Sequence, residues 1–336
     1  MATTSPLSAR KARWTGSTKV LAKEWTITIR GVLGPPEETG CDHEIIILNR
    51  IVTWGIGGIR WEADPRHAEL VIAACGVTGA RVTTPSVREK VEDTDKDDPY
   101  LTPDETTAYR SAKMRAAYLS QDRPDLQQAV RELAKGMSAP QQHHWQALKR
   151  LARYLRYRPR VVQHFSDQEM VTELEAWADA DHAGCVRTRK SVSGGVVMCG
   201  LSCIRTYSKG QAVISLSSGE SEYDGLVSAI SRLLGDGAMA QDWGIQFRLR
   251  VWMDASAGIS IGSRRGLGRV KHIDTVFLWV QQIVTQGRVR LGKKCTDEML
   301  ADILTKPVSE KIMERMLRGM AFFFEEGKHR LAKSTA

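Results

Sequence analysis

Between residues 173 and 306, runs with strand periodicity alternate with runs of helical periodicity, and this alternation narrows the folds that the chain can adopt. Strands are expected at 173–179, 194–199, 202–208, 248–253 and 288–292. Helices are expected at 217–234, 272–286 and 296–304. The order is βββαβαβα, in which crossover helices return the chain to one sheet. The pattern predicts an α/β fold with a mixed five-stranded sheet and flanking helices.

The region before residue 165 has a different pattern. Alternation at 25–30, an apolar run at 44–54 and a second run at 59–61 are typical of strands, and the glycines at 55–58 predict a hairpin turn between the last two. Asp64 and Pro65 are expected to cap and open a helix that ends near Cys75. The polar, acidic segment 84–103 is interpreted as a solvated linker.

Three further helices are expected at 102–120, 124–137 and 140–157. The third has one apolar face and one basic face, and the basic residues continue past its end: Lys149, Arg150, Arg153, Arg156, Arg158 and Arg160. A solvated helix face and a track for nucleic-acid phosphates both explain this pattern.

Basic side chains outnumber acidic ones over the whole chain, whose net charge is +9. Such a balance is typical of proteins with a polyanionic partner such as nucleic acid. Residues 1–20 are basic and polar and are expected to be disordered. They contain no apolar signal segment, and no apolar run is long enough for a membrane helix. The scattered cysteines are interpreted as reduced thiols, so an intracellular protein is expected in the cytoplasm or the nucleus.

Four acidic residues lie where a metal site can be built. Asp179 and Asp254 end strand-like runs, and Glu222 and Asp302 lie in helix-like runs. Carboxylates brought this close together repel one another unless cations neutralise them. Oxygen ligands without His or Cys select Mg²⁺ or Mn²⁺, and a pair of such ions suits phosphoryl-transfer chemistry.

Six short blocks then occur in order over about 130 residues: AWADADHAG at 176–184, RKSVSGG at 189–195, SLSSGESEY at 215–223, WMDASA at 252–257, KHID at 271–274 and ADILTK at 301–306. Together they resemble the ribonuclease H domain of copia-type LTR retrotransposon Pol polyproteins. Upstream, YRS at 109–111, DRPD at 122–125 and LKRLARYL at 148–155 resemble the stretch that joins reverse transcriptase to ribonuclease H.

The resemblance implies a ribonuclease H-like fold and hydrolysis of the RNA strand of RNA–DNA hybrids, leaving 5′-phosphomonoester ends. It implies two Mg²⁺ or Mn²⁺ ions held by Asp179, Glu222, Asp254 and Asp302, with Asp179 bridging both ions. Two neighbours compete for these roles, namely Asp181 with Asp179 and Glu220 with Glu222.

Basic clusters flank the acid-bearing blocks and are expected to bind the nucleic acid: Arg187, Arg189, Lys190, Arg264, Arg265, Arg269 and Lys271.

The chain departs from the family pattern in several places. His182 stands where Trp is usual, and Ala255 replaces a polar neighbour of Asp254. The loop before the last acid lacks the mobile histidine of cellular ribonucleases H, and His272 is the alternative nearest in sequence.

No Tyr-x-Asp-Asp motif with a partner aspartate precedes residue 173, so no polymerase activity is expected. The chain is interpreted as four parts: a disordered basic terminus at 1–20, a truncated reverse-transcriptase thumb or connection-like region at 21–165, a ribonuclease H-like domain at 173–306, and a C-terminal helix and tail at 307–336. The run 310–324 is expected to be helical.

Two other functions remain open. One is a catalytically inactive retroelement remnant that only binds nucleic acid. The other is an integrase-type recombinase on the same kind of fold, against which the ADILTK block and the absence of a zinc-binding His/Cys set argue.

Overall fold

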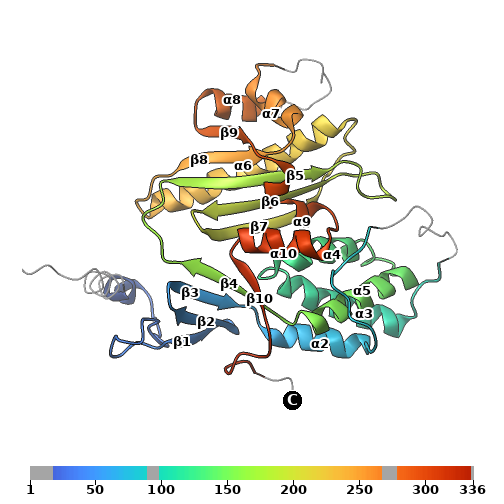
Figure 1. Cartoon of the computed structure of the whole chain (residues 1–336), viewed down its shortest axis with the longest axis horizontal. Coiled ribbons are helices and arrows are strands. Elements are labelled where there is room, and N and C mark those ends of the chain that lie inside the picture. The colour runs from blue at the N-terminus through green and yellow to red at the C-terminus, as the bar shows by residue number, and fades with distance from the viewer. Residues whose placement is uncertain (1–17, 89–97, 267–277, 334–336) are drawn as a thin grey trace, which may run out of the picture.

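Two five-stranded sheets with helices packed around them form the molecule (Figure 1). A computed structural model describes residues 18–88, 98–266 and 278–333. In this part of the chain no helix is both long and apolar enough to span a bilayer. Residues 18–24 are helical, and residues 1–17 of the predicted disordered terminus lie outside the described residues.

The sheet of the second half has the strand order β7-β6-β5-β8-β9. Its strands are β5 (Glu173–Asp181), β6 (Val192–Cys199), β7 (Ser202–Gly210), β8 (Arg248–Met253) and β9 (Val289–Lys293). β5, β6 and β7 are antiparallel neighbours, whereas β8 and β9 run parallel to β5. This mixed five-stranded sheet confirms the predicted ribonuclease H-like fold.

Helices cover one face of this sheet and fill a core with it. They are α6 (Ser218–Asp242), α7 (Ser256–Ser263) and α8 (Leu278–Thr285). Leu226, Ile230 and Leu233 of α6 are fully buried against the apolar side chains of β5 and β8. The sequence did not predict α7. Residues 272–277 of the predicted helix 272–286 lie outside the described residues.

The predicted helix 296–304 was wrong. The chain forms a single 3-10 turn, η3 (Thr296–Glu298), and then the short helix α9 (Asp302–Thr305). Met299 between them takes an extended backbone and is completely buried. Burial of this apolar side chain is therefore gained by breaking the helix.

The other sheet is antiparallel throughout, with the order β1-β2-β3-β4-β10. Its strands are β1 (Glu44–Ile47), β2 (Arg50–Gly55), β3 (Gly58–Glu62), β4 (Arg160–Ser166) and β10 (Phe322–Glu325). The predicted β2–β3 hairpin is confirmed, but the single strand expected at 44–54 is wrong. Leu48 and Asn49 have φ of +50° and +64° and turn the chain back on itself. Residues 25–30 form no strand.

The four upstream helices begin at or close to the prolines that the sequence indicated. They are α2 (Pro65–Cys75), α3 (Pro103–Leu119), α4 (Pro124–Ala134) and α5 (Gln142–Tyr157). Asp64 caps α2 by accepting from the Arg66 amide, and Thr102 and Glu105 form a capping box on α3. Proline opens α2, α3 and α4, in the position that tolerates its missing N–H.

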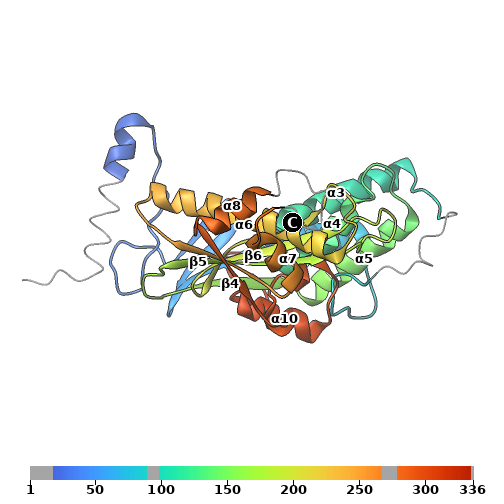
Figure 2. The same ribbon diagram turned by 90° about the horizontal axis from the view of Figure 1, so that it is seen from above.

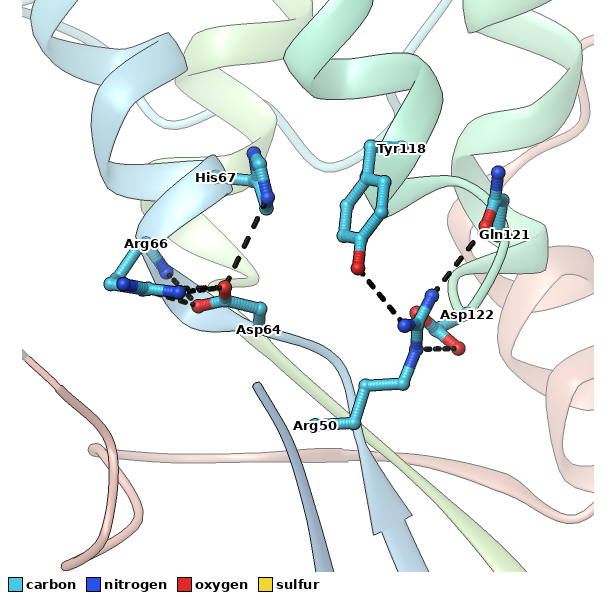
Figure 3. A network of polar contacts seen from close by, with 7 residues as sticks. All are labelled: Arg50, Asp64, Arg66, His67, Tyr118, Gln121 and Asp122. Carbon is cyan, nitrogen blue, oxygen red and sulfur yellow. Dashed lines mark hydrogen bonds and ion pairs between the residues drawn. The ribbon is translucent and has the colours of Figure 1, made fainter. Parts of the chain in front are cut away.

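A polar network joins the antiparallel sheet to α3 (Figure 3). The Arg50 guanidinium at the start of β2 donates to Asp122 at 2.7 Å and to the Tyr118 hydroxyl at 3.0 Å. Trp61 of β3 donates its indole N–H to the same carboxylate. Because Arg50 and Asp122 are both largely buried, this pair fixes the hairpin on the helices.

The upstream and C-terminal segments cover the second face of the ribonuclease H-like sheet. α4 contacts β7, and α9 contacts β5, β6 and β7. Seen from above, α6 and α8 lie on one side of β5 and β6, and α10 (Glu310–Gly319) lies on the other (Figure 2). Val196, Met198 and Cys203 of that sheet belong to one core with the upstream helices and α10. The two halves of the chain therefore share a hydrophobic core.

The C-terminal run 310–324 is a helix only as far as Gly319. The backbone turns at Ala321, which has a φ of +61°, and β10 then pairs with β4. Phe322 is buried in the shared core. A single helix through residue 324, as predicted, would have left this aromatic side chain without that burial.

Candidate metal centre

The carboxyl ends of two neighbouring parallel strands place the first acids of the site. Asp179 is close to the end of β5, and Asp254 directly follows β8. Parallel pairing of β5 and β8 brings both to one edge of the sheet. Glu222 comes from the second turn of α6, which packs on β5, and Asp302 opens α9.

Three of these acids meet in space. Asp179, Glu222 and Asp254 each offer one carboxylate oxygen, and the three oxygens lie within 4.8 Å of one another. Asp179 is buried, and the other two are partly buried. We call this group, together with Asp302, the acid cluster.

Asp302 joins the group through shared neighbours. The Lys306 ammonium lies 3.1 Å from an Asp302 carboxylate oxygen and 3.9 Å from an oxygen of Asp179. The Thr305 hydroxyl donates a hydrogen bond to Asp179. α9 and the residue that follows it thus supply an acid, a hydroxyl and a cation to the same place.

Burial, and then mutual repulsion, raise the affinity of the cluster for protons. Burial first, and then the charges of Asp179 and Asp254, raise the pKa of Glu222 to about 8. Burial and Asp179 likewise raise the pKa of Asp302 to about 7, against the opposing charge of Lys306. Burial opposes the charged form of Lys306, but the Asp179 and Asp302 carboxylates raise its pKa.

The cluster suits a hard divalent cation. One carboxylate oxygen of Glu222 is buried and has no hydrogen-bond partner in the described residues. Such an atom is costly to desolvate unless something electropositive binds it. The cluster's ligand oxygens all come from carboxylates, which Mg²⁺ and Mn²⁺ prefer to thiolate or imidazole sites. The residues present therefore fit the ions that the sequence resemblance implied.

The two competing acids lie in other environments. Asp181 is 3.7 Å from Arg88 and is not a member of the three-oxygen group. Glu220 accepts a hydrogen bond from the Leu216 amide at 2.8 Å, at the N-terminus of α6. The geometry therefore favours Asp179 and Glu222 as ligands.

The predicted nucleic-acid-binding residues occupy two places. Arg187, Arg189 and Lys190 are exposed in the β5–β6 loop, and Arg187 approaches the ring of His143 at 2.6 Å. Arg264 and Arg265 follow α7. Arg269, Lys271 and His272 lie outside the described residues.

Sequence reasoning missed the polar partners of the acids. Thr305 and Lys306 contact Asp179 and Asp302, and the Thr296 hydroxyl donates to Asp254 at 3.1 Å. Thr305 and Lys306 stand inside the ADILTK block, so their proximity to Asp302 was a usable signal. Nothing in the sequence linked Thr296 to Asp254.

No family model matches the chain. Among solved structures, it is similar to the N-terminal RNase H domain of Rv2228c from Mycobacterium tuberculosis, at 18% identity and a TM-score of 0.31, over 45% of this chain and 99% of that one. It is also similar to a foamy viral protease–reverse transcriptase, at 11% identity and a TM-score of 0.41, over 76% of this chain and 46% of that one.

Curated relatives are more similar in sequence. The chain is 32% identical over 217 residues to the retrovirus-related Pol polyprotein from transposon RE2 of Arabidopsis thaliana, covering 63% of this chain and 15% of that protein. It is 29% identical over 194 residues to the Pol polyprotein from transposon TNT 1-94 of Nicotiana tabacum, covering 57% of this chain and 14% of that protein. It is 40% identical over 107 residues to secreted RxLR effector protein 161 of Plasmopara viticola, covering 32% of this chain and 75% of that protein.

The chain thus spans about 15% of the length of the Pol polyproteins it matches. The matched Pol sequences agree with the family indicated by the six blocks, and the strand order agrees with its ribonuclease H-like fold. Over about 200 residues, the chain is therefore similar to a segment of the retrovirus-related Pol polyproteins from plant transposons.

Proposed function

We propose that this chain is a metal-dependent ribonuclease H that cuts the RNA strand of RNA–DNA hybrids internally. The observation that carries the proposal is the convergence of Asp179, Glu222 and Asp254 within 4.8 Å, on the strand ends and helix where the family blocks fall. The proposed products carry 5′-phosphate and 3′-hydroxyl ends, as the family resemblance implies.

In this proposal Asp179, Glu222, Asp254 and Asp302 would hold two Mg²⁺ or Mn²⁺ ions. When bound, these ions would supply an activated water and stabilisation of negative charge on the leaving oxygen. The Thr305 hydroxyl orients the Asp179 carboxylate, and the Thr296 hydroxyl orients that of Asp254. Lys306 pairs with Asp302 and lowers the repulsion within the acid cluster.

The substrate would be held mainly through its phosphates. The exposed side chains of Arg187, Arg189 and Lys190 follow β5, which carries Asp179, and Arg264 and Arg265 follow α7. Backbone contacts of this kind carry little base information, so weak sequence preference is expected. The 2′-hydroxyl groups and the A-form geometry would identify the RNA strand.

The remaining parts of the chain keep the roles that the sequence suggested. We propose that residues 21–165 derive from the end of a reverse transcriptase and have no polymerase activity, that 173–306 form the hydrolytic unit, and that 307–336 complete the fold. We also propose that the chain acts inside the cell, where its hybrid substrate arises.

The test is cleavage of a labelled RNA–DNA hybrid by the purified full chain with Mg²⁺, Mn²⁺ or EDTA. Metal-dependent loss of the RNA strand is expected, with duplex DNA left intact. Glu222→Gln should lower the rate at least about 100-fold, because metal-ion catalysis contributes several kcal/mol. Glu220→Gln is the matched control, since Glu220 lies two residues away and accepts a hydrogen bond from the Leu216 amide at the N-terminus of α6.

Equal rates for Glu222→Gln and the wild type would refute the site, and so would unchanged cleavage by Asp179→Asn. Failure of folded protein to cleave with either metal would favour the inactive remnant. Processing of duplex DNA ends in place of the hybrid would favour a recombinase.

A further inference from the structure

A large cavity lies beside the acid cluster, between the upstream helices and the β5–β6 loop. Its volume is about 1060 Å³, and side chains of α4, α5, residues 85–88 and residues 184–191 line it. Asp181 and Thr305 also line the cavity. Thr305 hydrogen-bonds Asp179, so the cavity opens directly beside the acid cluster.

Positive charge dominates the cavity wall. Among the residues that the structure describes, seven Arg and Lys side chains line it against three carboxylates, those of Asp98, Glu132 and Asp181. Each carboxylate already has a partner inside the cavity: Asp98 contacts His143, Glu132 lies 2.5 Å from Arg131, and Asp181 lies 3.7 Å from Arg88. None of these three acids therefore pairs with Arg150 or Arg153.

Arg150 and Arg153, three residues apart on α5, form the centre of this excess charge. No carboxylate among the described residues pairs with either one, and Arg150 donates only to the Thr84 hydroxyl, at 2.9 Å. Burial first, and then the charge of Arg153, lower the pKa of Arg150, so the two guanidinium groups repel each other. Like charges held together in a cavity are stabilised by an anion between them.

Unused hydrogen-bond donors point to the same conclusion. The Nε atoms of Arg131, Arg150 and Arg153 are buried and have no hydrogen-bond partner in the described residues. All three residues line the cavity. Arginine donors of this kind match the oxygens of a phosphate group.

An aromatic side chain completes the cavity. Tyr100 lines it and is 70% exposed, yet the backbone around it is fixed on the start of α5. The Leu101 amide donates to the Pro140 carbonyl at 2.9 Å, and the Gln142 amide donates to the Pro99 carbonyl at 3.0 Å. Proteins that bind single-stranded nucleic acid combine such a stacking platform with a basic groove.

We propose that this cavity binds a single nucleic-acid strand, about two or three nucleotides long, as the strand passes the acid cluster. Pockets of roughly 300–1000 Å³ hold one drug-sized molecule, so a few nucleotides fit and a duplex does not. Arg150 and Arg153 bind its phosphates, and a base stacks on Tyr100. The passage of the strand along a metal centre rests on the proposed function, whereas binding of the strand in the cavity does not.

The experiment measures binding of fluorescein-labelled single-stranded tetranucleotides to the full chain in EDTA, by fluorescence anisotropy over a range of salt concentrations. Arg150→Gln/Arg153→Gln should weaken binding at least about tenfold. It should also lower the salt slope by about 1.4, the value for two lost contacts to a single strand. Tyr100→Ala should weaken binding about fivefold or more and leave the slope unchanged.

Lys149→Gln/Arg156→Gln is the matched control, because it removes two positive charges from the same helix outside the cavity. It should weaken binding less than twofold. Thermal unfolding verifies that each variant is folded. If the first double variant is not folded, the single variants Arg150→Gln and Arg153→Gln replace it, and each should lower the salt slope by about 0.7.

Equal losses in the two double variants would overturn the proposal, because binding would then reflect overall charge. Displacement of the oligonucleotide by tripolyphosphate at equal phosphate concentration, with no effect of Tyr100→Ala, would also overturn it and leave only an anion site. Asp179→Asn separates this inference from the proposed function, since it should abolish hydrolysis and retain tetranucleotide binding. Conversely, hydrolysis by the wild type without tetranucleotide binding would refute strand binding in the cavity and leave the proposed hydrolytic function intact.

Discussion

At the scale of single residues, the acid cluster is organised by charge. Lys306 stands among Asp179 and Asp302 and compensates part of their repulsion, whereas one oxygen of Glu222 is buried and unbonded among the described residues. Glu222 therefore gains a proton in the metal-free protein more readily than an ordinary glutamate does. The group that most needs a cation is also the one most sensitive to pH.

This imbalance predicts how stability depends on pH. The folded-state pKa of Glu222 is raised to about 8 from an ordinary value of 4.5, so between these values the folded state binds more protons than the unfolded state. Under that condition the free energy of unfolding falls as pH rises. In EDTA, the thermal midpoint of the wild type should therefore drop between about pH 5 and pH 8, and Glu222→Gln should weaken that drop.

Differential scanning fluorimetry across this pH range provides the measurement. At pH 8 the midpoint of Glu222→Gln should exceed that of the wild type by a few degrees, since about 1 kcal/mol corresponds to about 2–4 °C in a chain of moderate size. Glu220→Gln should keep the wild-type dependence of the thermal midpoint on pH. Mg²⁺ should raise the thermal midpoint of the wild type more than that of Glu222→Gln. Parallel pH profiles for wild type and Glu222→Gln would contradict this account of the cluster.

At the scale of elements, the position of α9 depends on a close approach to β6. Gly194 pairs with Asp179 across β5 and β6. A Cβ atom on Gly194 would lie 2.7 Å from Thr305 Cγ2 and 2.9 Å from Leu304 Cβ. The absence of a side chain at this point therefore lets α9 bring Thr305 and Asp302 to Asp179. This explains structurally why a glycine occurs in the RKSVSGG block.

Gly194→Ala should push α9 away from β6 and affect both stability and the site. Overpacking of this kind costs about 1–3 kcal/mol, measured as the free energy of unfolding in urea. Mg²⁺ affinity, measured by calorimetry, should fall as well because Asp302 moves with the helix. Gly210→Ala at the end of β7 is the control, since its Cβ would meet nothing within 4 Å. Similar unfolding free energies and Mg²⁺ affinities for both variants would show that α9 tolerates the displacement.

At the scale of the whole molecule, segments far apart in sequence share one core. Met313, Met316 and Leu317 of α10 and Phe322 of β10 are buried together with α4, α5 and part of the ribonuclease H-like sheet. The Tyr154 hydroxyl of α5 donates to Asp125 and lies 3.7 Å from the Met313 sulfur. The segment after Lys306 therefore acts as part of the structure that joins the two sheets.

A chain that ends after Lys306 should not fold stably. It loses the four large buried side chains named above, each worth about 2–5 kcal/mol, against a total stability of about 5–15 kcal/mol. Circular dichroism and urea unfolding should show loss of the cooperative transition. A chain that ends after Gly327 loses ion pairs, such as that of Lys328 with Glu69, but keeps all four of these core side chains and should remain folded. Cooperative unfolding of the shorter chain would show that the ribonuclease H-like unit is independent.

Much of the ribonuclease H-like half could be predicted, because its signals are local. Strand alternation and helix caps identified β5 to β9 and α6 within a few residues at most ends, and the acids fell at strand ends and in helix-like runs. The parallel order then required Asp179 and Asp254 to share an edge. Glu222 was harder to choose over Glu220, because both lie near one helix terminus and only the packed helix shows which faces Asp179.

Other features depended on contacts between distant segments. Leu48 and Asn49 turn within an apolar run, Met299 breaks a helix to become buried, and β10 pairs with a strand about 160 residues earlier. Local propensity does not report these choices, since each is decided by which partner buries the apolar side chain. The sequence by itself determined the resemblance to Pol polyproteins, the mixed sheet and the candidate acids. Only the tertiary structure decided that Lys306 and Thr305 contact the acids, and that α5 and the β5–β6 loop enclose a basic cavity beside them.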